Sequence, residues 1–206
     1  MKKFVLCFLA FCLFSTGTAW AQMNVQKQFN TYKEKSLAGD LEAKAMLIYL
    51  VMEHPEKLEN ELLFAISQGE LAASGGNVIA QYNLGSIYTN GFQSIKKDRN
   101  KAIYWLSKAS DNGHNAASVL LGINLLREHT ATSKDGQFDA EFYNRVKTLL
   151  EFSVQEQHPY GLLALGGLLF YAGNEREEAK EHIKTAIALG AKEGEKILKK
   201  MQRVDK

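Results

Sequence analysis

Residues 80–113 carry two helical patterns of apolar positions, separated by a polar loop. Apolar residues three or four positions apart lie on one face of a helix, so each pattern predicts an amphipathic helix. Asp98 precedes the second pattern, where its carboxylate can accept backbone N–H groups of the first turn. Gly113 follows it, where a helix typically ends. The residues of the two faces are Ala80, Leu84, Ile87 and Tyr88, then Ala102, Leu106 and Ala109.

The hairpin predicted by these two helices recurs along the chain, which indicates a repeat architecture. Shifting the pattern 37 residues in either direction, then 44 and 33 residues further on, aligns small residues with small ones and leucines with leucines. Small residues permit close helix approach, and the larger ones interlock. The matching residues are Ala43, Leu47, Ala65, Ala72 and Gly76; Ala117, Leu121, Gly122 and Leu125; Leu150, Ser153, Gly161, Leu165, Gly166 and Leu169; and Ala179, Ile183, Ala186, Gly190, Gly194 and Leu198.

The register predicts a first helix, four helix pairs and a closing helix. A polar interval, residues 127–141, separates the helices of the third pair and accounts for the expansion of that repeat. Long loops are often functional, although insertions between repeat helices also cost little closure entropy. The predicted helices span 23–38, 40–53, 59–75, 77–89, 98–112, 115–128, 138–156, 159–172, 175–189 and 192–203.

The central hairpin resembles the Sel-one-like repeat (SLR), a relative of the tetratricopeptide repeat. The resemblance covers a whole unit, with a departure in the loop, where one residue is added and a second glycine is lacking. The matching positions are Gly85, Tyr88, Gly91, Asp98, Lys101, Ala102, Trp105, Ala109 and Gly113.

This resemblance implies an all-α fold: a right-handed alpha-solenoid of about four helix-hairpin repeats with terminal capping helices. Some relatives join each hairpin by a disulfide. Here Cys7 and Cys12 are the only cysteines, and both lie in the first 21 residues, so packing alone must hold the predicted hairpins.

Residues 1–21 have the pattern of a secretory signal peptide. Lys2 and Lys3 precede an apolar stretch, and Ala19-Trp20-Ala21 is typical of a cleavage site. We therefore predict a repeat domain over 22–206, located in the periplasm or secreted from a bacterium, with no membrane span after cleavage.

Charge and chemistry exclude several functions. Removing the two lysines leaves 23 basic and 23 acidic residues, a neutral balance that argues against nucleic-acid binding. The histidines lack zinc-binding spacing, and no serine elbow or thiol nucleophile is present beyond the signal sequence. We predict no catalytic residues, metal or cofactor, and interpret His114 and His158 as hairpin-turn residues. The five histidines are His54, His114, His129, His158 and His182.

The family resemblance places a concave groove on the first helix of each pair, opposite its core stripe. There the groove becomes apolar toward its C-terminal half, from Val119 to Phe170. Exposed apolar surface of that extent typically marks an interface, and Tyr and Arg often anchor one. The predicted partner-binding residues are Tyr49, Tyr82, Ser86, Asn90, Ile123, Arg127 and Tyr171.

Alternatives remain for these surfaces. The apolar groove residues can instead pack against neighbouring helices, and the polar loop around 133–137 can carry recognition in their place. Lysines and Arg203 give the closing helix a basic face, which suits a solvated cap better than an anionic partner.

The resemblance implies a protein–protein interaction module that binds another protein in its groove. One specific version is an immunity protein that neutralises a toxin delivered by type VI secretion. The alternative is a scaffold for envelope assembly or signalling. An enzyme resembling beta-lactam hydrolases is disfavoured, because the relevant cysteines and a serine–lysine motif are missing.

The signal sequence leads to a first testable prediction. Export should remove residues 1–21, so the N-terminal sequence of the exported protein should begin at Gln22. Edman degradation of the periplasmic or secreted fraction measures this. Intact Met1 in the membrane fraction would contradict it.

Overall fold

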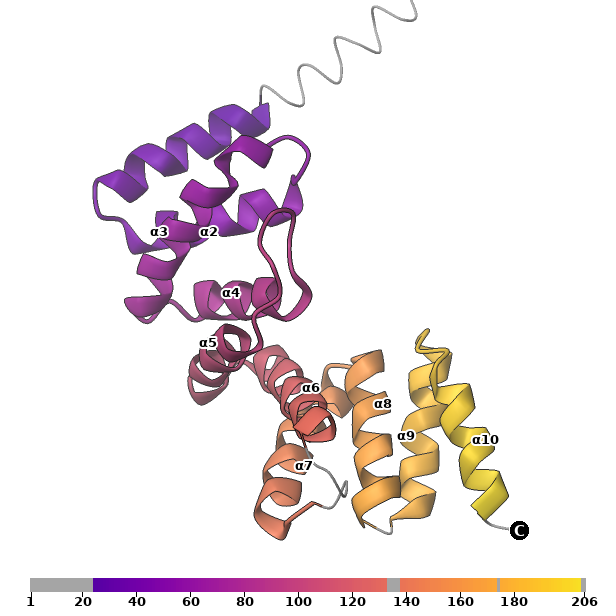
Figure 1. Cartoon of the computed structure of the whole chain (residues 1–206). Coiled ribbons are helices and arrows are strands. Elements are labelled where there is room, and N and C mark those ends of the chain that lie inside the picture. The colour runs from indigo at the N-terminus through magenta and orange to yellow at the C-terminus, as the bar shows by residue number, and fades with distance from the viewer. Residues whose placement is uncertain (1–23, 133–137, 174, 205–206) are drawn as a thin grey trace, which may run out of the picture. The chain divides into compact units, whose positions relative to one another are not determined.

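The computed structural model describes residues 24–132, 138–173 and 175–204. Residues 1–21, the predicted signal peptide, and residues 133–137 of the predicted polar interval lie outside these ranges. Within them the chain is helical and contains no strand, with one isolated bridge between Phe92 and Ile95 in the loop (Figure 1). The predicted all-α class is therefore confirmed.

The helices follow the predicted order. Residues 24–37 are helical. The elements after them are α2 (Leu41–Glu53), η1 (Glu59–Glu61), α3 (Leu62–Ser74), α4 (Val78–Asn90), α5 (Arg99–Asp111), α6 (Asn115–Thr132), α7 (Ala140–Gln155), α8 (Pro159–Leu168), the π-helical turn η2 (Leu169–Gly173), α9 (Arg176–Ala188) and α10 (Gly194–Val204).

Two helix ends differ from the prediction by four residues, more than any other end. The α6 helix continues to Thr132 instead of ending at 128, and His129 in this extension stacks on Phe138 and Phe142, with ring centres 4.5 and 4.6 Å apart. The Thr130 hydroxyl there donates to the carbonyl of Leu126 at 3.0 Å. The α8 helix ends at Leu168, and the chain widens into a π-turn that keeps Leu169 fully buried.

The chain divides into two compact units, one ending at Leu84 and one beginning at Gly85. The first unit contains the helix at 24–37, the α2–α3 hairpin and the first turns of α4. The second contains the end of α4 and the helices from α5 to α10.

Five turns between helices share one backbone geometry. In each, a residue with positive φ follows a helix, and the next N–H donates to a carbonyl five residues earlier, at 2.9–3.1 Å. This is a Schellman turn, which glycine favours because it has no Cβ. The residues with positive φ are Gly39, Gly76, Gly113, Gln157 and Gly190, at the intervals that the sequence register predicts.

The residue after most of these turns caps the next helix. The side chains of Asp40 and Asn77 accept the N–H groups of Ala43 and Ala80, at 3.0 and 2.9 Å. His114 and His158 take the same position before α6 and α8. One short sequence thus ends one helix and begins the next.

Each hairpin is closed by a glycine packed against a branched side chain. A Cβ added to Gly85 would lie 2.6 Å from Leu106 Cγ, and one on Gly122 would lie 2.9 Å from the corresponding atom of Leu150. The same contact joins Gly166 of α8 to Ile183 of α9, at 2.6 Å. The backbones approach so closely at these points that no side chain fits on the glycine.

The α2–α3 hairpin contains this pair with the two residues exchanged. The branched residue, Ile48, lies on the first helix, and Gly69 lies on the second. A Cβ on Gly69 would lie 1.7 Å from Ile48 Cδ1. The repeat therefore fixes the combined volume of the two positions and not the residue at either one.

The core positions expected from the central hairpin are buried, whereas the last one of the repeat series is not fully buried. Ala102 and Ala109 are fully buried, and Trp105 is 7 % exposed. Leu198, at the last repeat position, is half-buried.

The exchanged pair predicts a non-additive mutational cycle. Gly69→Leu should overpack the first hairpin by about 1–3 kcal/mol, and Ile48→Gly should cost roughly 2–5 kcal/mol through the cavity it leaves. The double variant reproduces the Gly85–Leu106 arrangement, so it should recover about 0.5–3 kcal/mol relative to the sum. Denaturant unfolding of all four proteins measures the coupling, and additive losses would contradict the shared-volume interpretation.

Candidate functional site

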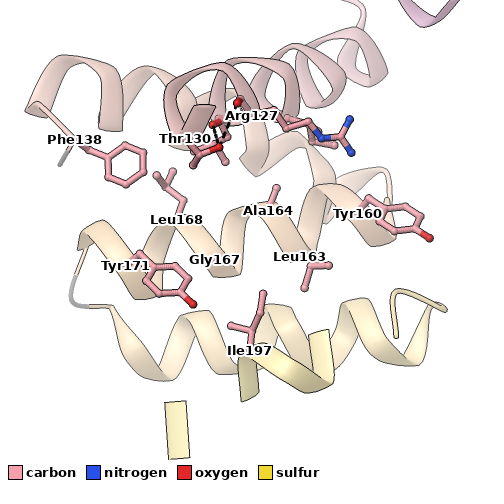
Figure 2. A pocket seen from close by; sticks show the side chains of 12 residues that line it. Arg127, Thr130, Phe138, Tyr160, Leu163, Ala164, Gly167, Leu168, Tyr171 and Ile197 are labelled. Carbon is pink, nitrogen blue, oxygen red and sulfur yellow. Dashed lines mark hydrogen bonds between the residues drawn. The ribbon is translucent and has the colours of Figure 1, made fainter. Parts of the chain in front are cut away.

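An apolar groove of about 320 Å³ lies on the second unit. Its walls come from α6, α8 and α10 (Figure 2). Phe138, which precedes α7, and Tyr171 of the π-turn complete the lining. We call this surface the apolar groove. It is lined by Ile123, Leu126, Arg127, Thr130, Phe138, Tyr160, Leu163, Ala164, Gly167, Leu168, Tyr171 and Ile197.

The repeat register explains why these residues meet. Ile123 and Gly167 occupy equivalent positions of successive repeats, and Arg127 is equivalent to Tyr171. Because each first helix packs its small face into its own hairpin, the opposite face is left to line the groove. Gly167 leaves open space in the lining, since a Cβ added there would meet no atom within 4 Å.

Two tyrosines give the groove its exposed aromatic surface. Tyr160 is 49 % exposed and Tyr171 is 54 % exposed. Figure 2 shows them toward opposite ends of α8, with Ala164 and Gly167 between them. The ammonium group of Lys200 lies 4.7 Å from the ring centre of Tyr171 and favours that orientation of the ring.

A second, polar hollow of about 520 Å³ lies on the same unit and shares Arg127 with the groove. We call it the cationic hollow. Asn124 and Thr89 are both largely buried and hydrogen-bonded to each other at 3.0 Å, so this part of the lining is fixed. The lining residues are Tyr88, Thr89, Asn90, Lys97, Arg99, Asn124 and Arg127.

The structure brings together four of the seven predicted partner-binding residues. Ile123, Arg127 and Tyr171 line the apolar groove, and Asn90 lines the cationic hollow with Arg127. The remaining three, Tyr49, Tyr82 and Ser86, line neither hollow, and Ser86 of the second unit and Tyr82 of the first unit are half-buried.

Tyr49 lies on the first unit and lines a different surface. It is 44 % exposed and contributes to an apolar hollow of about 330 Å³ with Met46 and Ile79. Its position on the first helix of a hairpin is as predicted.

The choice between exposed groove and internal packing differs from residue to residue. Val119 is fully buried, and a Cβ on Gly161 would lie 2.5 Å from it, so Val119 belongs to the core. Ile123 is only 6 % exposed, so it is largely part of the core. Replacing it by aspartate would bury a charge and destabilise the fold, so that substitution could not test binding by itself. Leu163 is half-buried, whereas Tyr171 is exposed.

Sequence reasoning missed several lining residues. Tyr160 and Ile197 were outside the predicted set, as were Lys97 and Arg99 of the loop and α5 start. The register contained a signal for Ile197, which is equivalent to Ala164 on the preceding first helix.

The two turn histidines have a structural role. The Nδ1 atoms of His114 and His158 accept the N–H groups of Ala117 and Gly161, at 3.3 and 2.9 Å. Burial lowers the pKa of His158, which favours the neutral ring that this cap requires. Both histidines lie in the turns, as predicted, and they also cap the helices that follow.

Metal-binding clusters and membrane-spanning helices are both absent from the described part of the chain. Its His, Cys, Asp and Glu side chains form no group of three or more that could hold a metal ion. None of its helices has the length and apolar character to cross a membrane.

The family model of the Sel1 repeat matches residues 78–114, which form the α4–α5 hairpin. The chain carries a Sel1 repeat. Sel1 repeats generally act as protein–protein interaction modules.

Curated relatives match this chain over part of their length. The Arabidopsis thaliana ERAD-associated E3 ubiquitin-protein ligase component HRD3B is 27 % identical over 99 residues, covering 48 % of this chain and 14 % of that protein. Chitin synthase regulatory factor 2 of Schizosaccharomyces pombe is 28 % identical over 132 residues, covering 64 % and 25 %. The chain spans at most a quarter of these two relatives.

Two solved Sel1-type structures resemble the fold. A protective antigen of uropathogenic Escherichia coli with an SLR fold matches with a TM-score of 0.60 and 20 % identity, over 77 % of this chain and 32 % of that chain. A Sel1 repeat protein from Oxalobacter formigenes matches with a TM-score of 0.57 and 22 % identity, over 81 % and 65 %.

A polar clasp joins the α6–α7 and α8–α9 hairpins of the second unit. Glu175, at the start of α9, accepts hydrogen bonds from Lys147 Nζ at 2.7 Å and from the Tyr143 hydroxyl at 2.5 Å, both on α7. These two donors lower the pKa of Glu175, the Lys147 bond having the larger effect. Burial, followed by the bond to Glu175, raises the pKa of Tyr143. The clasp is a stabilising contact.

The clasp predicts a pH-dependent stability. A carboxylate whose pKa is lowered by folding stabilises the fold above its unfolded pKa, and the effect is lost as pH falls through the folded value. Glu175→Gln should therefore lower stability at pH 7 by about 1 kcal/mol, a figure reduced for partial solvent exposure. The deficit should shrink below pH 4.5, the ordinary value. Thermal melts of both proteins from pH 7 to pH 3 measure this.

Glu177→Gln is the matched control, because that side chain is 84 % exposed in its ion pair with Lys180. It should change the melting temperature little at any pH. A pH-independent deficit in Glu175→Gln would show that the carboxylate charge is not what stabilises the clasp.

Proposed function

We propose that this chain is a non-enzymatic module that binds a partner protein in the apolar groove of its second unit. The observation that carries the proposal is the open groove between α6, α8 and α10, with two exposed tyrosines and a bare Gly167. Tyrosine offers a large contact area with a polar tip and is common at interface anchors. The relatives named above, a ligase component and a regulatory factor, also fit a partner-binding role.

We further propose that the chain acts after export, in the periplasm or outside a bacterium. The support is the sequence pattern of residues 1–21. Within that location we propose an immunity protein that neutralises a toxin delivered by type VI secretion. An envelope scaffold is the competing role.

The groove makes a sharp prediction for Gly167→Leu. The new side chain should fill the groove without touching the core, and replacing a helical glycine should preserve or raise stability by up to about 1 kcal/mol. Binding of a partner recovered from periplasmic extract should weaken by roughly 1–4 kcal/mol, as should binding to Tyr171→Ala. Isothermal titration of the mature protein, beside thermal melts, measures both quantities.

Two matched variants control for indirect effects. Gly167→Ala gains the same helical backbone but leaves most of the groove open, so binding should persist. Tyr104→Ala removes an equally exposed tyrosine, 54 % like Tyr171, from α5 outside the groove. If Gly167→Leu binds like the natural chain while changes in 133–137 abolish binding, the loop carries recognition and the groove proposal is wrong.

The immunity role has its own test. Cells of the producing bacterium that lack this protein should be killed by type VI-armed sister cells, and periplasmic production of the natural chain should restore survival. Gly167→Leu should fail to restore it at equal abundance. Unchanged survival of the deletion strain, with disturbed envelope assembly, would favour the scaffold.

A further inference from the structure

The apolar groove and the cationic hollow share Arg127, so one extended ligand can reach both. We propose that the bound partner segment carries acidic residues next to a large apolar residue. Its carboxylates would lie on the cationic hollow, and the apolar side chain would lie in the apolar groove. This inference rests on the proposed function and adds the chemistry of the partner.

Charge is the first argument. Lys97, Arg99 and Arg127 are the charged residues among those that line the two hollows, and no acidic residue is among them. Among the described residues, none of these three cations has an ion-pair partner. Three neighbouring cations without a carboxylate create a local positive field that favours an anionic ligand.

The acids next to these cations in sequence do not line the hollows. The Asp98 carboxylate accepts the Lys101 N–H at 3.0 Å and caps α5. Glu128 follows Arg127 but is absent from both linings. Since the whole chain has 25 basic and 23 acidic residues, the positive field is local and is not an average property of the surface.

Geometry is the second argument. The hydrogen bond between Asn124 and Thr89 fixes the polar lining, and the Asn124 amide also donates to the Leu120 carbonyl at 2.8 Å. Arg127 lies at the junction, where a guanidinium can hold a carboxylate by two parallel hydrogen bonds. Charge and apolar contact are thus offered side by side, which suits a peptide with both kinds of residue.

Acidic side chains fit this arrangement better than a chain terminus. A C-terminal carboxylate supplies one anionic group, whereas the hollow presents three cations on α6, on α5 and in the loop before it. Two or more Asp or Glu side chains of one segment can engage them together.

Selection of displayed peptides tests the proposal. Random 12-residue peptides, with their C-termini joined to the display protein, are selected on the mature chain and counter-selected on Gly167→Leu. Peptides that require the open groove should be enriched in Asp and Glu at a fixed distance from Leu, Phe or Trp. A second library with free C-termini is selected in parallel.

The best acidic peptide is then synthesised and titrated by fluorescence anisotropy. Replacing Lys97, Arg99 and Arg127 together by Gln should weaken it by about three- to a hundredfold, because each exposed ion pair contributes about 1.4- to fivefold. Its Glu→Gln and Asp→Asn version should lose a similar factor, and both differences should shrink in high salt. The matched control replaces Lys192, Arg145 and Arg203 by Gln, which changes net charge equally outside the hollows.

Each other outcome overturns the inference in a distinguishable way. Groove-dependent peptides with no excess of acids, or insensitive to the triple variant, would leave the proposed function standing and reject the acidic partner. Enrichment confined to free C-termini would assign the cations to a terminal carboxylate. If neither library yields a groove-dependent peptide, both this inference and the groove proposal fail.

Discussion

The close approach of two helices at the centre of each hairpin is the constraint on which the other features depend. At that point one helix supplies a glycine and the other a branched side chain, and a Cβ on the glycine would lie 1.7–2.9 Å from it. Interiors pack at crystal-like density, so the sum of the two volumes is fixed even where the residues exchange helices. Ile48 with Gly69 satisfies the same constraint as Gly85 with Leu106. The glycine-ended turns and capping residues then place the next helix in the same way.

This packing also determines which surface remains for function. Because the small face of each first helix is used inside its own hairpin, its opposite face has no partner within that hairpin. In the second unit, α6, α8 and α10 present these faces to one groove. Gly167 illustrates the difference from its neighbour Gly166: a Cβ on Gly166 would clash with Ile183, whereas one on Gly167 would meet open space. Of these two adjacent glycines in one helix, Gly166 thus permits close helix packing, and Gly167 keeps the groove open.

The sequence predicted the repeated hairpins well because their signals are local and periodic. Asp98 and Gly113 bound their helix as expected, and the intervals between turns are those of the register. The exchange at Ile48 escaped prediction, since comparing equivalent positions cannot show compensation across two helices. The groove was predicted only in part, because the helical pattern indicates which way a side chain faces but not how deeply it is buried. Ile123 is almost buried, and Tyr160, which also lines the groove, was missed.

Local arrangement of charge gives information that the total charge conceals. The 25 basic and 23 acidic residues of the whole chain nearly balance, which argues against non-specific attraction to polyanions, yet Lys97, Arg99 and Arg127 line one hollow without an acidic residue among its lining. Exposed ion pairs contribute little free energy individually, so such cations act mainly on the choice and orientation of a partner. The apolar groove would then supply most of the affinity, through area removed from water around Tyr160 and Tyr171. Arg127 lines both surfaces. A single ligand must therefore place its acidic and its apolar groups on either side of this residue.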